Sequence, residues 1–216
     1  MFSLQLADPR TILCIGAHCD DIEIGCGGTL ASWAQQYPHA RFIWAVFSCT
    51  DQKRTEETRT AARALLGPTA QIEFLPHEFP DSYFPAHYAQ LKDAIEVIRR
   101  NVSPDVVLTH ATCDRHQDHR TLAELTWNAF RNHLVLEYEI PKFEGDLAHP
   151  NVFVPLSESC VRHKVQTLLA SFASQAGRDW FTADTFLALM RLRGIECRAA
   201  SGFAEAFHGR KIVLAH

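Results

Sequence analysis

The sequence predicts an α/β protein with a Rossmann-like, mostly parallel sheet flanked by helices, and with extra β/α elements in the C-terminal third. Short apolar runs alternate with longer segments at helical spacing through the first two thirds of the 216 residues. Repeated strand–helix units imply right-handed crossovers and a parallel sheet that is covered on both faces. No linker, internal repeat or low-complexity segment divides the chain, so we expect a single domain over residues 1–216.

The first two thirds of the chain predict four strands, each followed by a helix. The strands are short, and apolar or β-branched; in order they are Thr11–Gly16, Arg41–Phe47, Gln71–Leu75 and Asp105–Thr109. Apolar side chains at helical spacing mark three of the helices: Leu30, Trp33, Ala34 and Tyr37 after the first strand, Tyr88, Leu91, Ile95 and Ile98 after the third, and Leu122, Leu125 and Ala129 after the fourth. The helix after the second strand, Arg54–Leu66, is rich in Ala, Arg and Glu and ends at Gly67-Pro68.

The last third is less regular. Val135–Ile140 and Val152–Leu156 predict two strands, for which we expect antiparallel additions to the sheet. Apolar residues over 161–172 predict an amphipathic helix, and Ala183–Arg193 predicts a further one. Lys211–Leu214 is a candidate for the final strand.

Composition excludes several classes of protein. Hydrophobic residues make up 47% and charged residues 21%, as in ordinary globular domains. A net charge of −4 without basic runs argues against a nucleic-acid partner. No apolar run reaches the roughly 18–20 residues of a membrane span, and the start lacks the basic and apolar regions of a signal peptide. Seven cysteines without a Cys-x-x-Cys pair indicate reduced thiols and a cytoplasmic location.

Two polar clusters follow strands of the predicted sheet. His18, Asp20 and Asp21 come after the first strand, and His116 and His119 follow the fourth. An imidazole and two carboxylates beside a buried strand are costly unless they bind something. Ligands of open parallel sheets bind beyond the carboxyl ends of the strands, so we expect the clusters to converge, although they are 98 positions apart (116 − 18 = 98).

These residue types suit a hydrolytic metal centre. Such zinc sites usually offer three N or O ligands and leave one position open. His18, one Asp of the 20–21 pair and one His of the 116–119 pair would supply the ligands. The other Asp would take a proton from the attacking water. The second His would polarise a carbonyl, stabilise an oxyanion or protonate a leaving amine, with Asp118 or Asp114 orienting it.

Each feature alone has a simpler interpretation. One histidine among twelve is most often a surface or capping residue, and Asp20-Asp21 suits a helix N-cap. Gly25, Gly27 and Gly28 suit a tight turn into the next helix; for a dinucleotide loop they miss the G-x-G-x-x-G order, and the acidic pair would repel a pyrophosphate. The combination of His-x-Asp-Asp after one strand and His-x-x-His after another is harder to explain in these ways.

Both motifs resemble those of the PIG-L/LmbE-like family of zinc-dependent N-deacetylases. The family pattern is Ala-His-Pro-Asp-Asp-Glu, then Gly-x-Gly-Gly and a later His-Pro-Asp-His. Residues 17–28 here read Ala-His-Cys-Asp-Asp-Ile-Glu-Ile-Gly-Cys-Gly-Gly, and residues 116–119 read His-Gln-Asp-His. The resemblance covers residues 10–130 and extends, less specifically, to Ala-Glu-Ala-Phe at 204–207.

The resemblance implies a role for each matched residue. Zinc would be bound by His18, Asp21 and His119. Asp20 would be the general base, and His116 the electrostatic or acid catalyst, oriented by Asp118. Arg54, in an Arg-x-x-Glu element, and Asp81, in an Asp-Ser loop, match substrate-facing positions, although an Arg on a helix more often lies on a solvated face.

Three positions depart from the family pattern. Cys19 and Gln117 replace prolines, so both turns lose a fixed φ angle. Cys19 is a small turn residue in the simplest interpretation, and a spare soft ligand or an oxidation site in the alternative. Ile22 replaces the usual Glu, with Glu23 beside it, which leaves the role of that Glu open.

The implied activity is that of a metal-dependent amidase on a non-peptide C–N bond, removing an N-acetyl group from an amino sugar or its conjugate. Zn²⁺ is the expected cofactor, with another divalent metal such as Fe²⁺ as an alternative. The expected partner is an N-acetylated sugar of the N-acetylglucosamine type. A homo-oligomer is compatible with the sequence. The rival interpretation is a non-catalytic carbohydrate-binding protein with a degenerate metal site, against which an intact ligand set and base argue. The sequence leaves open how the sugar is linked, and the roles of Tyr138, Glu139, Arg193 and Glu205.

Overall fold

The computed structural model describes residues 3–213, in which strands and helices alternate through the first two thirds as the sequence predicts. The strands are β1 (Thr11–His18), β2 (Arg41–Ser48), β3 (Gln71–Pro76), β4 (Val106–His110), β5 (Leu134–Tyr138), β6 (Val152–Pro155) and β7 (Ala204–Gly209). The helices are α1 (Asp21–Gln36), α2 (Gln52–Leu66), α3 (Tyr88–Asn101), α4 (Gln117–Ala129), α5 (Glu158–Ser171) and α6 (Ala183–Glu196), with short 3₁₀ segments η1 (Phe84–His87) and η2 (Ala173–Gln175).

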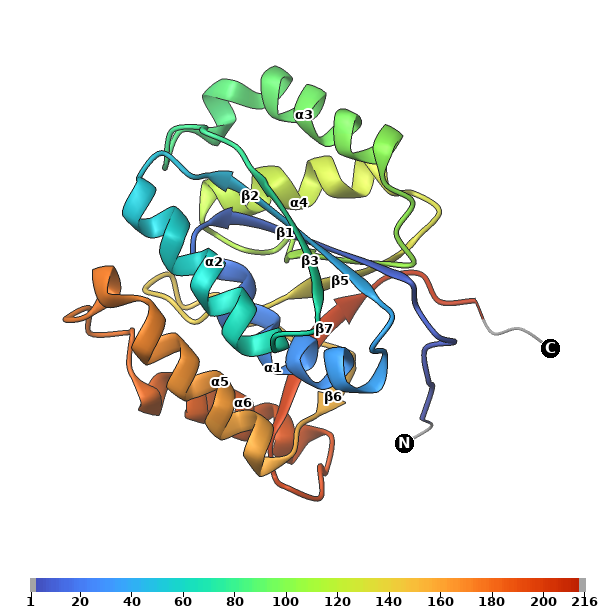
Figure 1. Ribbon diagram of the computed structural model, residues 1–216, viewed down its shortest axis with the longest axis vertical. Coiled ribbons are helices and arrows are strands. Elements are labelled where there is room, and N and C mark those ends of the chain that lie inside the picture. The colour runs from blue at the N-terminus through green and yellow to red at the C-terminus, as the bar shows by residue number, and fades with distance from the viewer. Residues whose placement is uncertain (1–2, 214–216) are drawn as a thin grey trace.

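The strands of the described chain form one seven-stranded, mostly parallel sheet in the order β3-β2-β1-β4-β5-β7-β6 (Figure 1). All pairings from β3 to β5 are parallel, and β7 is antiparallel to both β5 and β6. The predicted fold class, a Rossmann-like sheet with added elements in the last third, is therefore confirmed.

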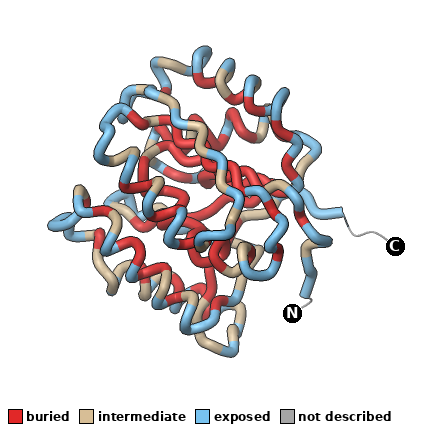
Figure 2. The backbone as a smooth tube through the Cα atoms, viewed as in Figure 1, coloured by how far each residue is buried: buried red, intermediate tan, exposed pale blue. Residues whose placement is uncertain are grey.

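Helices cover both faces of the sheet. Figure 1 shows α3 and α4 on one side, and α1, α2, α5 and α6 on the other. Successive side chains of β1 point to opposite faces: Ile12 and Cys14 pack in one core, Leu13 and Ile15 in the other. Burial on both faces explains why the central strands read as continuous apolar runs, and Figure 2 shows them as the buried centre of the molecule. No helix within residues 3–213 is long and apolar enough to cross a membrane.

Two predictions for the last third are wrong. β5 is parallel to β4, whereas the sequence predicts an antiparallel strand there. The final strand is β7, which inserts between β5 and β6, and not Lys211–Leu214. Residues 211–213 form no strand, and Leu214 lies outside the described residues. Val213 is 92% exposed, so the apolar residues of this segment are not part of a buried strand.

The glycines at 25–28 lie inside α1 and not in a turn before it. A Cβ at Gly25 would overlap the ring of Tyr138, and one at Gly28 would lie 3.0 Å from Glu205 Oε1. These glycines therefore permit close packing of α1 against the last third of the chain.

The order of the strands reverses beside β1, because β2 lies on one side of it and β4 on the other. β1 ends at His18 and β4 at His110, so both place an imidazole at the same edge of the sheet. Such a switch point is where open α/β sheets bind their ligands.

Candidate active site

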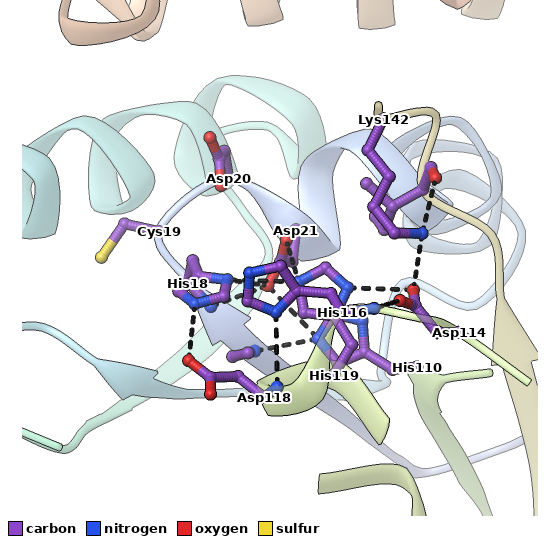
Figure 3. A network of polar contacts seen from close by, with 12 residues as sticks. His18, Cys19, Asp20, Asp21, His110, Asp114, His116, Asp118, His119 and Lys142 are labelled. Atoms are coloured by element: carbon purple, nitrogen blue, oxygen red, sulfur yellow. Dashed lines mark hydrogen bonds and ion pairs between the residues drawn. The ribbon is translucent and has the colours of Figure 1, made fainter. Parts of the chain in front are cut away.

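Six residues singled out in the sequence lie together at this edge of the sheet (Figure 3). They are His18, Asp20, Asp21, His116, Asp118 and His119. The first three end β1 and begin α1, and the last three form the N-cap and first turn of α4. Two helix N-termini thus meet at the site, and their partial positive charge favours anionic groups there.

His18, Asp21 and His119 form a triangle of donor residues, in which a different Asp21 oxygen lies nearest each imidazole. His18 Nδ1 lies 3.2 Å from His119 Nε2 and 3.3 Å from Asp21 Oδ2, and His119 Nε2 lies 3.5 Å from Asp21 Oδ1. Ligands of a tetrahedral zinc ion, at bond lengths of about 2.0–2.1 Å, lie about 3.3–3.4 Å apart. Two imidazoles and a carboxylate fit zinc in chemistry, and the separations between these residues are close to those of its ligands. His116, His110 and the carboxylates of Asp81 and Asp118 offer further groupings of donors nearby.

Carboxylates on its far side orient the His18 ring. His18 Nε2 lies 3.1 Å from Asp81 Oδ1 and 3.3 Å from Asp118 Oδ2. When the ring is neutral, a proton on Nε2 is directed at these carboxylates and the Nδ1 lone pair faces the triangle. Burial alone would lower the pKa of His18, but the charge of Asp21 and the hydrogen bonds to Asp118 and Asp81 raise it well above its usual value.

Asp114 and Lys142 support His119 in the same way. His119 Nδ1 lies 2.9 Å from Asp114 Oδ2, which also accepts a hydrogen bond from Lys142 Nζ at 3.0 Å (Figure 3). A second carboxylate, Asp146, accepts from the same ammonium at 2.8 Å. Burial and the neighbouring His110 lower the pKa of His119 to about 4, so its imidazole is neutral at pH 7, the form that binds metals.

His110 is a member of the cluster that the sequence analysis missed. Its ring is fully buried and stacks on His119 at 3.9 Å, and its Nε2 lies 3.2 Å from Asp21 Oδ2. Nε2 accepts a hydrogen bond from the Ala17 amide at 2.9 Å, and Nδ1 has no partner within residues 3–213. The predicted strand Asp105–Thr109 ends one residue before His110. A His directly after a central strand is the sequence signal that would identify it.

Asp20 lies apart from the triangle and pairs with Arg54. Arg54 Nη2 donates to Asp20 Oδ2 at 3.0 Å and to the Cys19 carbonyl at 3.4 Å. Burial, followed by the charge of Asp21, raises the pKa of Asp20 to about 6, against the opposing effect of Arg54. A carboxyl group with a pKa near neutrality can accept and release a proton at physiological pH.

The His116 ring lies edge-on to His18 and tilted against His119. Its ring centre lies 5.0 Å from that of His18 and 4.5 Å from that of His119. The Asp118 amide donates to His116 Nδ1 at 3.3 Å, so the proton of a neutral His116 resides on Nε2. The Asp118 carboxylate, by contrast, accepts hydrogen bonds from the amides of Ser82 and Phe84 at 2.6 and 3.0 Å and faces His18. This differs from the expected orientation of His116 by Asp118, because the first turn of α4 directs that side chain inward.

The two predicted substrate-facing residues both contact the cluster. Asp81, whose side chain is 56% exposed, contacts His18, and Arg54 holds Asp20. Gln117, which stands where the family has proline, donates from its side chain to the Ser82 carbonyl and so links α4 to the same loop. Cys19 directs its sulfur away from the imidazoles (Figure 3).

The residues without an assigned role hold the last third together. Glu139 and Arg193 form a buried ion pair at 2.6 Å, and the Tyr138 hydroxyl donates to the Ile15 carbonyl at 2.6 Å. Glu205 pairs with Lys164 at 2.6 Å. Of these side chains only Tyr138 reaches the cluster, at 3.3 Å from His110 Nε2.

Comparison with known proteins identifies relatives in sequence. A family model described as PIG-L, GlcNAc-PI de-N-acetylase, matches residues 13–130. The uncharacterized deacetylase YaiS of Escherichia coli is 37% identical over 175 residues, covering 74% of this chain and 89% of that protein.

Solved structures share the fold. The N,N'-diacetylchitobiose deacetylase of Pyrococcus horikoshii superimposes with a TM-score of 0.68 at 19% identity, covering 94% of this chain and 84% of that one. A 4-carboxy-2-hydroxymuconate hydratase from Pseudomonas putida superimposes with a TM-score of 0.73 at 20% identity, covering 96% and 98%. Because a deacetylase and a hydratase share it, the fold alone does not fix the reaction.

Proposed function

This chain belongs to the PIG-L family, and on that premise we propose that it is a zinc-dependent hydrolase that removes an N-acetyl group from an amino sugar or sugar conjugate. The observation that carries the proposal is the triangle of His18 Nδ1, Asp21 and His119 Nε2, with 3.2–3.5 Å between donors. A binding module needs no such set of oriented donors.

His18, Asp21 and His119 would hold the metal. Bound zinc supplies a Lewis acid that polarises the acetyl carbonyl and lowers the pKa of water to about 7. Two imidazoles and a carboxylate also suit Fe²⁺, which stays an alternative cofactor. Asp81 and Asp118 behind His18, and Asp114 behind His119, fix the ring orientations that this requires.

Asp20 is the general base of the proposal. Its carboxylate takes the proton of the attacking water, and the raised pKa matches that task. Arg54 holds Oδ2 of this carboxylate through a hydrogen bond, which leaves Oδ1 for the water. Arg54 is therefore proposed as a positioning residue as well as a substrate-facing one.

His116 is the proposed electrostatic or acid catalyst. Because Nδ1 accepts from the Asp118 amide, Nε2–H is available to donate to the oxyanion that forms at the acetyl carbonyl. Acid catalysis at the departing amine would need the imidazolium form; with a neutral His116, the amine takes the proton that Asp20 has removed from the attacking water. Collapse of the tetrahedral species then yields acetate and the free amino sugar.

N-acetylated sugars of the N-acetylglucosamine type are the proposed substrate class. The family description names GlcNAc-PI, and a structural relative is a diacetylchitobiose deacetylase. Asp81 offers an exposed carboxylate that can accept hydrogen bonds from sugar hydroxyls. All seven cysteines are free, which supports the cytoplasm as the proposed compartment.

The test is acetate release from a panel of N-acetylated sugars, including free N-acetylglucosamine and its glycosides. The zinc-loaded protein is expected to release acetate and primary amine in equal amounts. The Asp20→Asn variant is the matched control, since it keeps the shape of the side chain but not the base. Binding of a sugar without acetate release would favour the carbohydrate-binding alternative and contradict the proposal.

A further inference from the structure

Cys19 and Cys49 form a pair of buried thiols beside the candidate active site. Their Sγ atoms lie 3.6 Å apart, and the side chains belong to residues that are 1% and 8% exposed. The residues before them, His18 and Ser48, are register partners in the parallel pairing of β1 with β2. The two cysteines therefore leave the sheet from neighbouring strands, which are about 4.8 Å apart in such sheets.

The two reduced thiols lie close enough to form a disulfide after a small movement. Bonded sulfurs lie about 2.05 Å apart, with Cα atoms about 4.4–6.8 Å apart, a range that neighbouring strands satisfy. Carbonyl oxygens compete for the thiol protons: Cys19 Sγ lies 3.6 Å from the Ser48 oxygen, and Cys49 Sγ lies 3.7 Å from the Val46 oxygen. Closing the sulfurs from 3.6 Å to bonding distance requires them to approach by about 1.5 Å.

A small cavity adjoins Cys49. Its volume is about 10 Å³, room for about one water-sized molecule, and Cys49, Thr55, Thr58 and Arg59 line it. The hydrogen bond from Cys19, assisted by Thr55 and by the charge of Arg59, lowers the pKa of Cys49 against the effect of burial. Cys49 is thus the more reactive thiol of the two.

We propose that Cys19 and Cys49 are an oxidation site, at which a peroxide forms a reversible disulfide that disables the neighbouring metal centre. The Cys49 thiolate attacks one peroxide oxygen; an S–O bond forms, the O–O bond breaks, and the leaving hydroxide takes a proton to become water. Cys19 then attacks the Cys49 sulfenic acid; the S–S bond forms, the S–O bond breaks, and the departing hydroxide takes the Cys19 proton. Two thiols are oxidised, and one peroxide is reduced to two waters.

The disulfide disables the metal centre through the position of Cys19 in the chain. Cys19 is the single residue between His18, a proposed metal ligand, and Asp20, the proposed base. Its carbonyl and the Asp20 carboxylate are both bound by Arg54 Nη2, so a shift of residue 19 also breaks this clamp. A metal ligand or base displaced by about 1 Å loses much of its function.

The test begins with zinc-loaded wild-type protein, treated with hydrogen peroxide and then with an alkylating reagent that blocks free thiols. Peptide mass spectrometry is expected to show a link between Cys19 and Cys49 that a thiol reductant removes. The oxidised protein is expected to bind zinc at least about tenfold more weakly, in a competition assay with a chromogenic chelator, and to regain affinity on reduction. Acetate release should fall and recover in parallel.

Two variants serve as controls. Cys49→Ser should keep basal activity and lose no zinc on peroxide treatment, whereas Cys113→Ser, which removes an exposed thiol outside the pair, should behave as wild type. Absence of the 19–49 link, or a link that leaves zinc affinity unchanged, overturns the proposal. So does equal zinc loss from Cys49→Ser.

The zinc measurement rests on the metal site of the proposed function and the acetate measurement rests on its activity, whereas the 19–49 link rests on neither. A link that forms and weakens zinc binding, in a protein that releases acetate from no sugar in either state, contradicts the proposed function and leaves the oxidation site standing.

Discussion

Adjacent carboxylates in the site have opposite electrostatic surroundings. Burial raises the pKa of Asp20 to about 6, with a further increase from Asp21. Burial also acts to raise the pKa of Asp21, but the imidazoles of His119, His110 and His18 outweigh it and hold that pKa well below its usual value. Environments that separate the pKa values of two neighbouring acids are a common basis for dividing their roles. This asymmetry supports Asp21 as the permanently ionised group and Asp20 as the proton acceptor.

Replacing Asp114 by Ala should weaken zinc binding about 10–100-fold, because His119 loses the carboxylate that fixes its tautomer and ring orientation. The dissociation constant can be measured by competition with a chromogenic chelator. Asp93→Ala, on the exposed face of α3, is the control and should bind zinc as the wild type does. Unchanged affinity in Asp114→Ala would contradict the role of this carboxylate.

His77 should make folding sensitive to mild acid. Burial lowers its pKa below the usual value, so below about pH 6.5 the unfolded chain binds a proton that the folded protein does not. The free energy of unfolding therefore falls as the pH decreases through this range, and this contribution is absent above it. His77→Phe, which keeps the stacking on Phe47, should lose less stability than wild type between pH 7 and 5 in denaturant titrations. The control, His39→Phe at an exposed position, should show the same pH dependence of the free energy of unfolding as wild type. The same pH dependence in His77→Phe would contradict the role of His77.

At the scale of elements, α1 connects the site to the last third of the chain. Its first residue is Asp21, and seven to eight residues later the Gly28 and Thr29 amides donate to the Glu205 carboxylate of β7 at 2.9 and 2.6 Å. Lys164 of α5 pairs with the same carboxylate and donates to the Ile24 carbonyl. The Ala-Glu-x-Phe element thus acts in the structure as a buried clamp on α1.

Glu205→Gln should destabilise the protein by about 3–5 kcal/mol, because it leaves the Lys164 ammonium buried without its counter-charge. Denaturant unfolding followed by circular dichroism measures the loss. Glu158→Gln removes the partner of Arg162 in a pair whose side chains are 64% and 68% exposed, and should cost less than about 1 kcal/mol. Equal losses in the two variants would show that the buried pair contributes no more to the free energy of unfolding than the exposed pair.

The sequence predicted the elements best where a strand is buried on both faces and a helix follows it. The predicted strands over 11–47 agree with β1 and β2 to within two residues, because apolar periodicity and burial coincide there. β7 is not predicted from the sequence, because a glutamate and small residues do not form an apolar run. Their burial depends on partners in α1 and α5. The glycines of α1 suit a turn in the sequence alone, because what they permit, close approach of Tyr138 and Glu205, is a tertiary contact.

At the scale of the whole molecule, the sheet order explains how residues far apart in sequence form one site. β1 and β4 are neighbours at the reversal of strand order, so the motifs at 18–21 and 116–119 share one edge. The sequence predicts this convergence from the alternation of strands and helices alone. Lys142 and Asp146 could not be foreseen, since they come from an irregular loop after β5 that no motif marks.

Zinc should raise the melting temperature, because its proposed ligands join the end of β1 and the start of α1 to α4. At about 100 times the dissociation constant, the stabilisation is about 2.7 kcal/mol. Differential scanning fluorimetry with and without a chelator measures the shift. His119→Ala should melt at the same temperature in both conditions; a wild-type protein indifferent to zinc would contradict the metal centre.

The most direct test compares metal content and acetate release in two variants of neighbouring residues. Asp20→Asn should retain about one zinc per chain, as wild type does, and lose activity by about 10²–10⁴-fold. Asp21→Ala should lose both the zinc and the activity. Full activity in both variants, or loss of zinc from Asp20→Asn with retention in Asp21→Ala, would contradict the assignment of the metal to Asp21 and of the proton to Asp20.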